Sequence, residues 1–181
     1  VTANRGTYVG TMRTTGSVGT TTMEFWGTAL GGTAAIIGVY NQYNQVVHRA
    51  ASHDNTNNWT YSSATWRAAN ASNAMRVSMI RGSDDEPVRS LYLINCVGIA
   101  ATTGAVTSIA LDATNAVGQL GTQNSNSNLI ALNVEYRGWP GLGYHFLQAV
   151  EFNTAEAQNS TFYGDNGVTY MPSGLVTVWK G

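Results

Sequence analysis

The chain has 181 residues, of which 43% are hydrophobic and only 10% are charged, and its formal net charge is −1. This hydrophobic content excludes a disordered chain. The near-neutral net charge excludes the strongly basic surface that is typical of nucleic-acid-binding proteins. Charged residues average about 25% in globular proteins, so Thr, Ser, Asn, Gln and Gly must cover this surface, as suits a particle-bound or extracellular protein in a packed assembly.

Alternating apolar and polar residues predict a series of short strands, because period-2 spacing lets a strand bury one face. Residues 34–40 and 44–49 are expected to form a hairpin. Only residues 65–73 and 154–158 are compatible with a turn of helix, and neither has an apolar stripe. The strands are predicted at residues 7–12, 23–26, 34–40, 44–49, 58–66, 75–80, 88–101, 105–112, 129–136, 144–152, 161–164 and 175–179.

Residues 58–82 are predicted to form a central strand–loop–strand unit, a core hairpin. Trp59, Tyr61 and Trp66 supply large rings to its first half. In the second half, Met75, Val77 and Met79 are expected to share one buried face, with Arg76, Ser78 and Ile80 on the other. The small polar residues 68–73 between them are typical of a surface turn.

Many short strands with Gly-rich turns and no helical pattern predict an all-β fold with little helix. We expect a single jelly-roll-like β-sandwich of antiparallel strands that spans residues 1–181, since no linker or internal repeat divides the chain. No run approaches the roughly 18 apolar residues that cross a bilayer, so membrane insertion is not expected.

The cysteine and the histidines of the sequence give little indication of a reactive thiol or a metal site. Cys96 is the only cysteine, so no intrachain disulfide forms, and its apolar surroundings predict a buried core residue. His48 and His53 are expected to flank a loop with Asp54 beside the second, but their spacing matches no strong metal-ligand pattern. His145 is expected on the polar face of a strand or at a subunit contact. We therefore predict no metal site.

Two groups of carboxylates are candidates for a chemical role, one for binding Ca²⁺ and one for glycosidase catalysis. Asp84, Asp85 and Glu86 offer oxygen ligands for Ca²⁺, but a hairpin tip that keeps a sheet edge soluble is the favoured interpretation. Glu135 and Glu151 lie on strands predicted to be neighbours and resemble the pair that glycosidases need. Because both alternate with apolar residues, we expect them on a solvated face, and no catalytic residue is predicted.

Aromatic residues are abundant, with five Trp and nine Tyr. Tyr43 and Trp139 lie on predicted turns, where a ring can stack on a sugar or pack against a neighbouring subunit. Most of the others are expected in the core or at subunit contacts, and we single out Trp59, Tyr61, Trp66 and Trp179.

Five phrases of the sequence, in this order and spacing, resemble a group of tailed-phage virion proteins of the structural, decoration, head-fibre and tail-fibre type. The resemblance covers about the first two thirds of the chain and implies a non-enzymatic structural protein on the virion surface. Where such proteins have a more basic hairpin, this chain has Gln42 and Gln45. The phrases are RGTYVGTMRTTG at 5–16, VYNQYNQV at 39–46, NWTYSSATWRAAN at 58–70, MRVSMIRGSDDEPV at 75–88 and IALDAT at 109–114.

The last third carries the pattern YHFLQAVEF, TFYGDNG and GLVTVW at residues 144–152, 161–167 and 174–179. It is similar to the closing strands of trimeric jelly-roll heads, such as the tumour-necrosis-factor and C1q-like knobs. The similarity implies a homotrimer that associates around an apolar axis.

The sequence is compatible with three functions. The first is a virion structural protein, in capsid decoration, a head fibre or a fibre tip, with itself and other virion proteins as partners. The second is a carbohydrate-binding module that recognises host surface polysaccharide through Tyr43 and Trp139. The third is a polysaccharide-degrading enzyme that uses Glu135 and Glu151. None of them requires a cofactor, nucleic acid or a membrane.

Overall fold

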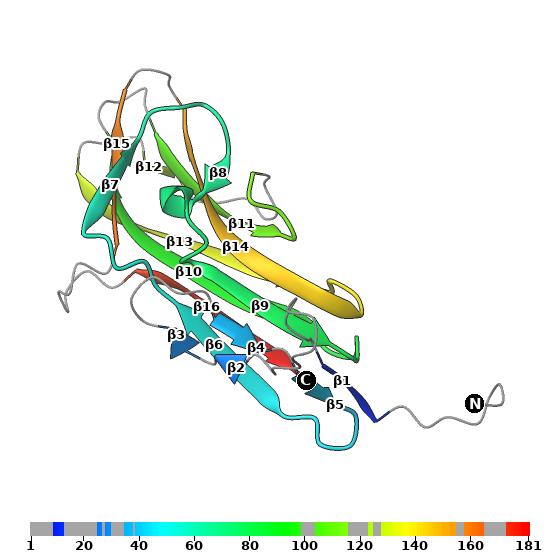
Figure 1. Ribbon diagram of the computed structural model, residues 1–181. Coiled ribbons are helices and arrows are strands. Elements are labelled where there is room, and N and C mark those ends of the chain that lie inside the picture. Colours follow the sequence, from blue (N-terminus) through cyan, green and yellow to red (C-terminus); the bar gives the residue numbers. More distant parts are fainter. Residues whose placement is uncertain are drawn as a thin grey trace, which may run out of the picture.

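The fold is all-β, as predicted, and consists of two seven-stranded sheets packed as a jelly-roll-like sandwich (Figure 1). The computed structural model describes residues 9–12, 25–26, 28–29, 35–37, 39–98, 104–115, 123–124, 128–154, 158–164 and 173–181. In this part of the chain the only helical element is a 3-10 turn, η1 (Ala69–Ala71), and no helix is long and apolar enough to cross a membrane.

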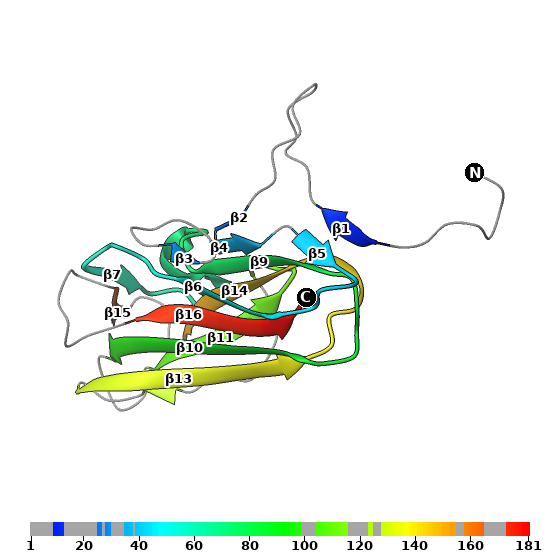
Figure 2. The same cartoon turned by 90° about the horizontal axis from the view of Figure 1, so that it is seen from below.

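The first sheet is centred on β10 and is called the β10 sheet. Its order is β3-β6-β16-β10-β15-β7, and β13 pairs with the other side of β10 along the whole strand, from Val88↔Gly138 to Val97↔Leu129. Figure 2 shows β6, β16, β10 and β13 side by side. The strands are β3 (Thr28–Ala29), β6 (Val47–Ser52), β7 (Asn58–Tyr61), β10 (Val88–Val97), β13 (Leu129–Gly138), β15 (Ser160–Tyr163) and β16 (Gly174–Lys180).

The second sheet is centred on β14 and is called the β14 sheet. Its order is β12-β11-β14-β9-β4-β2, and β8 continues the edge of β14 beyond β9. Among the described strands the pairs are antiparallel, except for β4 with β9 here and β3 with β6 in the β10 sheet, which are parallel. The strands are β2 (Phe25–Trp26), β4 (Ala35–Ile37), β8 (Arg67–Ala68), β9 (Arg76–Arg81), β11 (Ala105–Leu111), β12 (Gln123–Asn124) and β14 (Gly143–Asn153).

The core lies between the inner faces of the two sheets. On β10 every second residue points inward, and Tyr92, Ile94 and Cys96 are fully buried. Val77 and Met79 do the same from β9, so their predicted place in the core and the buried position of Cys96 are both confirmed. The opposite face of β9 is covered as well, since Ser78 and Ile80 are also buried. Each large apolar side chain buried in this way contributes about 1.5–3 kcal/mol of transfer free energy.

Residues 58–82 do not form the predicted hairpin. β7 belongs to the β10 sheet, where it pairs with β15, whereas β9 belongs to the β14 sheet. The connection between them, which includes β8 and η1, therefore carries the chain from one sheet to the other. This stretch links the two layers instead of forming one edge of a single layer.

The hairpin predicted for residues 34–49 is also wrong. β5 (Val39–Asn41) pairs with β1 (Gly10–Met12) in a separate two-stranded ribbon, and β6 pairs with β16 and β3. The loop between β5 and β6 thus connects two different sheets. Other predictions lie partly outside the described residues: the start of the strand at 7–12, the end of the strand at 88–101 and the helical turn at 154–158.

Candidate functional site

One end of the sandwich gathers several chain connections, and we call it the loop end (Figure 1, lower right). It comprises residues 42–46, 82–87 and 139–142, together with Gly181, whose backbone exchanges two hydrogen bonds with that of Val46. Strand register places these connections together, because Lys180 pairs with Val47, Val88 with Gly138 and Gly143 with Arg81.

Both turn aromatics predicted to contact a ligand or partner lie at the loop end. Tyr43 is 69% exposed and Trp139 is 57% exposed. Tyr43 precedes β6 and Trp139 follows β13, and these strands are separated by β16 and β10. Three inter-strand spacings amount to about 14 Å. The two rings are therefore carried by loops attached to different, non-adjacent strands of the sheet.

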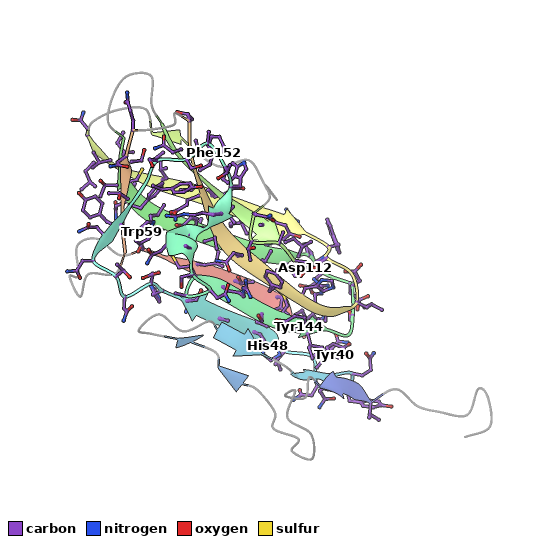
Figure 3. The ribbon with its side chains drawn as sticks, turned by 45° about the horizontal axis from the view of Figure 1, so that its top comes forward. Tyr40, His48, Trp59, Asp112, Tyr144 and Phe152 are labelled. Atoms are coloured by element: carbon purple, nitrogen blue, oxygen red, sulfur yellow. The ribbon has the colours of Figure 1, made fainter. Side chains whose placement is uncertain are left out.

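Exposed apolar side chains concentrate at the loop end. In the part of the chain for which burial is described, ten large hydrophobic residues are exposed. Four of them lie in the loop end, and three more, Val9, Val47 and Tyr144, lie directly beside it. Figure 3 shows Tyr144 and Tyr40 toward this end and Trp59 and Phe152 toward the other. A concentration of exposed apolar side chains at one end of the molecule favours an interaction surface there. The seven residues are Val9, Tyr43, Val46, Val47, Trp139, Leu142 and Tyr144.

The acidic turn also lies at the loop end, but it is not a hairpin tip. It connects β9 in one sheet to β10 in the other. Its carboxylates already have partners: Asp84 accepts from Arg81, Asp85 accepts from the Ser83 hydroxyl, and Glu86 lies 3.5 Å from the Lys180 ammonium. No group of three metal-ligand side chains occurs among the described residues.

The three histidines have separate structural surroundings. His48 and His53 do not flank a loop, since they lie at opposite ends of β6, and the His48 ring packs on Trp179 at 5.6 Å. Burial lowers the pKa of His48. His53 donates from Nδ1 to the Ser173 carbonyl, and His145 donates from Nδ1 to Asp112 at 2.7 Å.

Glu135 and Glu151 are not neighbours, and the expectation that both point to solvent is wrong for one of them. Glu135 is exposed on β13, in the β10 sheet. Glu151 is on β14, in the other sheet, with 0% of its surface exposed. A glycosidase pair must face one substrate from both sides. These two glutamates cannot do so, because one lies outside the sandwich and the other lies within it.

Glu151 instead joins the two sheets through a buried polar contact. Its Oε2 accepts from Trp59 Nε1 on β7 at 2.7 Å, and its Oε1 accepts from Arg67 Nε and Nη2, also at 2.7 Å. The Arg67 guanidinium lies 3.8 Å from the centre of the Tyr61 ring. Burial raises the pKa of Glu151 to about 7, while the Trp59 and Arg67 contacts oppose that rise.

The four aromatics predicted for core or subunit packing divide into two groups. Trp59 and Trp179 are buried members of the core, and Tyr61 packs against its margin. Trp66 is half-buried, with its ring 5.1 Å from that of Phe152. None of the four is among the exposed aromatics of the loop end.

A feature that the sequence did not reveal is a row of arginines across the outer face of the β10 sheet. Arg49 pairs with Val178, Val178 with Arg89, and Arg89 with Arg137. Directly paired residues share one face, so the three arginines form a line across four strands, and all three are exposed. The nine Lys and Arg looked scattered in sequence, since only strand register brings these three together.

Two adjoining hollows lie along this row. The first has a volume of about 440 Å³, with Arg49, Arg89 and Glu135 at its polar positions. Its apolar lining comes from Leu91, Val176 and Val178. The second, of about 300 Å³, shares Arg89 and Val178 with the first and extends to Glu86 and Lys180 near the loop end. Along the two hollows the positive side chains Arg49, Arg89 and Lys180 outnumber the negative side chains Glu86 and Glu135.

No protein-family model matches the chain, and no curated protein matches it significantly.

Proposed function

We propose that the chain is a non-enzymatic structural domain on the surface of a phage virion, in capsid decoration, a head fibre or a fibre tip. The proposal is supported by the five virion-like phrases, the low fraction of charged residues and the all-β sandwich. The observation that carries it is the apolar loop end. The loop end and the residues directly beside it carry seven exposed hydrophobic side chains, which favour burial against another protein.

Self-association as a homotrimer, and contact with other virion proteins, form part of the proposal. The loop end is the favoured surface for these contacts, because Arg81 and Lys180 pair with two of the three carboxylates of its acidic turn, Asp84 and Glu86. Burial of an exposed Trp or Tyr against a partner removes a large apolar area from water. A net charge of −1 adds little long-range repulsion between copies.

Two measurements test this proposal. Light scattering coupled to size exclusion should give three times the monomer mass of 19.3 kDa. Sedimentation of the purified protein with particles of the phage that encodes it, after removal of the native copies, should return it to the pellet. A stable monomer that stays in the supernatant would overturn the proposal.

A second role, attachment to host surface polysaccharide, is favoured by the exposure of Tyr43 and Trp139. An exposed ring on a loop can stack on the apolar face of a sugar, and the neighbouring Asn44 can bond its hydroxyls. Gln42 and Gln45 each use one amide atom to bond the Tyr40 hydroxyl, which leaves the other for a sugar. This role is compatible with the first, since a structural domain at a virion surface also meets the cell. Attachment would then use loop residues and leave the core unchanged.

A further inference from the structure

We propose that the outer face of the β10 sheet binds an acidic polysaccharide through the row formed by Arg49, Arg89 and Arg137. The inference deepens the attachment role proposed above and rests on it for the biological source of the ligand. It is carried by a separate surface, since the row lies on a sheet face and the aromatics Tyr43 and Trp139 lie on loops.

The spacing of the row suits a linear ligand. Arg49 and Arg89 are two strands apart and Arg89 and Arg137 are one strand apart, so the separations along the sheet are about 10 Å and 5 Å. A guanidinium presents a planar fork of donors that fits carboxylate and phosphate oxygens two at a time. A polymer that repeats such groups along its length would meet the arginines in succession.

The arginines have no evident role in holding the fold together. Within the described residues, none of the three forms an ion pair. Arg89 and Arg137 lie directly opposite each other, and like charges in that position are destabilising. A row that forms no ion pair within the described residues and that sets two like charges opposite each other is consistent with a binding role.

The shape of the face supports the same ligand class. The larger hollow has a floor of Leu91, Val176 and Val178, which can contact the C–H faces of sugar rings. Arg49 and Arg89 stand at its polar positions with Glu135, which can accept from sugar hydroxyls. The face therefore combines cations for acidic groups with an apolar surface and an acceptor for the sugars that carry them.

A second copy of the chain is a poorer occupant of this face. Lys180 and Glu86 offset each other, and the three arginines against Glu135 leave two uncompensated positive charges. Two such faces would repel. Nucleic acid is also disfavoured, because three cations are few for a polymer that carries a charge about every 1.7 Å, and the rest of the chain is net negative.

Calorimetry on the complete protein with four polymers tests the ligand class. Polygalacturonate carries carboxylates, teichoic acid carries phosphates, dextran is neutral, and single-stranded DNA represents nucleic acid. We expect binding to at least one of the first two, weakened by added NaCl, and none to dextran; the stronger of the two identifies the acidic group. Absence of binding to both acidic glycans, equal binding to dextran, or tightest binding to DNA would overturn the inference.

Single substitutions test the site. Arg89→Gln, Arg49→Gln and Arg137→Gln should each weaken binding by about 3- to 10-fold and reduce its dependence on NaCl. Arg76→Gln is the matched control, since it removes the same charge from the outer face of the β14 sheet, where Arg76 lies 4.2 Å from the Phe146 ring. An equal loss in this control would overturn the assignment.

Sedimentation with phage particles in the absence of glycan separates this inference from the structural role. If the arginine variants still return to the particles but no acidic glycan binds the protein, the binding site is wrong and the structural role holds. If glycan binding follows the arginines but the protein never returns to particles, the structural role is wrong and the binding site holds.

Discussion

Arg89 and Arg137 face each other directly in the β10–β13 strand pair, on the exposed side of the sheet. Opposed like charges in an antiparallel pair raise the free energy of the folded state. Arg49 extends the same row two strands away, so the arrangement is a line of positive charge rather than one unfavourable pair. Stability and binding are therefore expected to respond in opposite directions when this row is altered.

Arg137→Glu should stabilise the protein and weaken its binding to acidic glycans. The substitution replaces repulsion of Arg89 by attraction, and we expect the free energy of unfolding to rise by about 0.5–1 kcal/mol in urea titrations. Arg137→Gln, which only removes the repulsion, should give a smaller gain. A decrease of stability in Arg137→Glu would show that Arg137 has a structural contact that outweighs its repulsion of Arg89.

Stability should fall as the pH rises from about 4.5 to 7. Burial raises the pKa of Glu151 from 4.5 to about 7 in the folded protein. Between these values the folded state holds a proton that the unfolded chain has released, so raising the pH favours unfolding. The loss amounts to about 3 kcal/mol at most. Urea titrations at several pH values measure it.

Glu151→Gln isolates this effect, because glutamine cannot ionise. The difference in unfolding free energy between wild type and variant should change over the pH range 4.5 to 7, whereas Glu135→Gln, at an exposed position, should follow the wild type. The difference is the proper measure, since the lowered pKa of His48 makes stability rise with pH and partly masks the Glu151 effect. Parallel curves for wild type and Glu151→Gln would contradict the raised pKa.

Trp59→Phe should destabilise the protein and move the Glu151 transition to higher pH. The substitution removes the Nε1 donor to Glu151 but retains a ring that can pack on Phe162. Loss of a hydrogen bond to a buried carboxylate costs about 1.5–3 kcal/mol. Trp66→Phe is the matched control, since it removes the same atoms from a half-buried ring that packs on Phe152. Equal losses in the two variants would show that the bond to Glu151 adds nothing.

Local pattern predicted the strands well but not their partners. Val77 and Met79 lie in the core, as expected. Alternation says which residues share a face, but not which sheet a strand enters. The connection from β7 to β9 is long enough either to turn back within one sheet or to cross from one sheet to the other, and in the structure it crosses. Only contacts distant in sequence, such as Trp59 with Glu151, decide between the two.

Glu151 and the arginine row show why residue type and local pattern alone do not predict where a side chain lies in the fold. Glu151 was expected on a solvated face because it alternates with Val150 and Phe152. In β14 both faces are covered, since Val150 is buried and Phe152 packs against Trp66, so alternation did not identify the inner face. The sequence does not predict the arginine row, because Arg49, Arg89 and Arg137 are far apart in the chain and only strand register aligns them on one face.

Trp139→Ala should weaken attachment to host cells and leave the fold intact. The Trp139 ring is 57% exposed at the loop end, so its loss should change the free energy of unfolding by no more than about 0.5 kcal/mol. Loss of a stacking contact with a sugar should lower cell binding several-fold, measured with fluorescent protein on whole cells. Leu129→Ala is the control, since Leu129 is also exposed but lies at the other end of β13. Unchanged cell binding in Trp139→Ala, or an equal loss in Leu129→Ala, would remove Trp139 from the attachment surface.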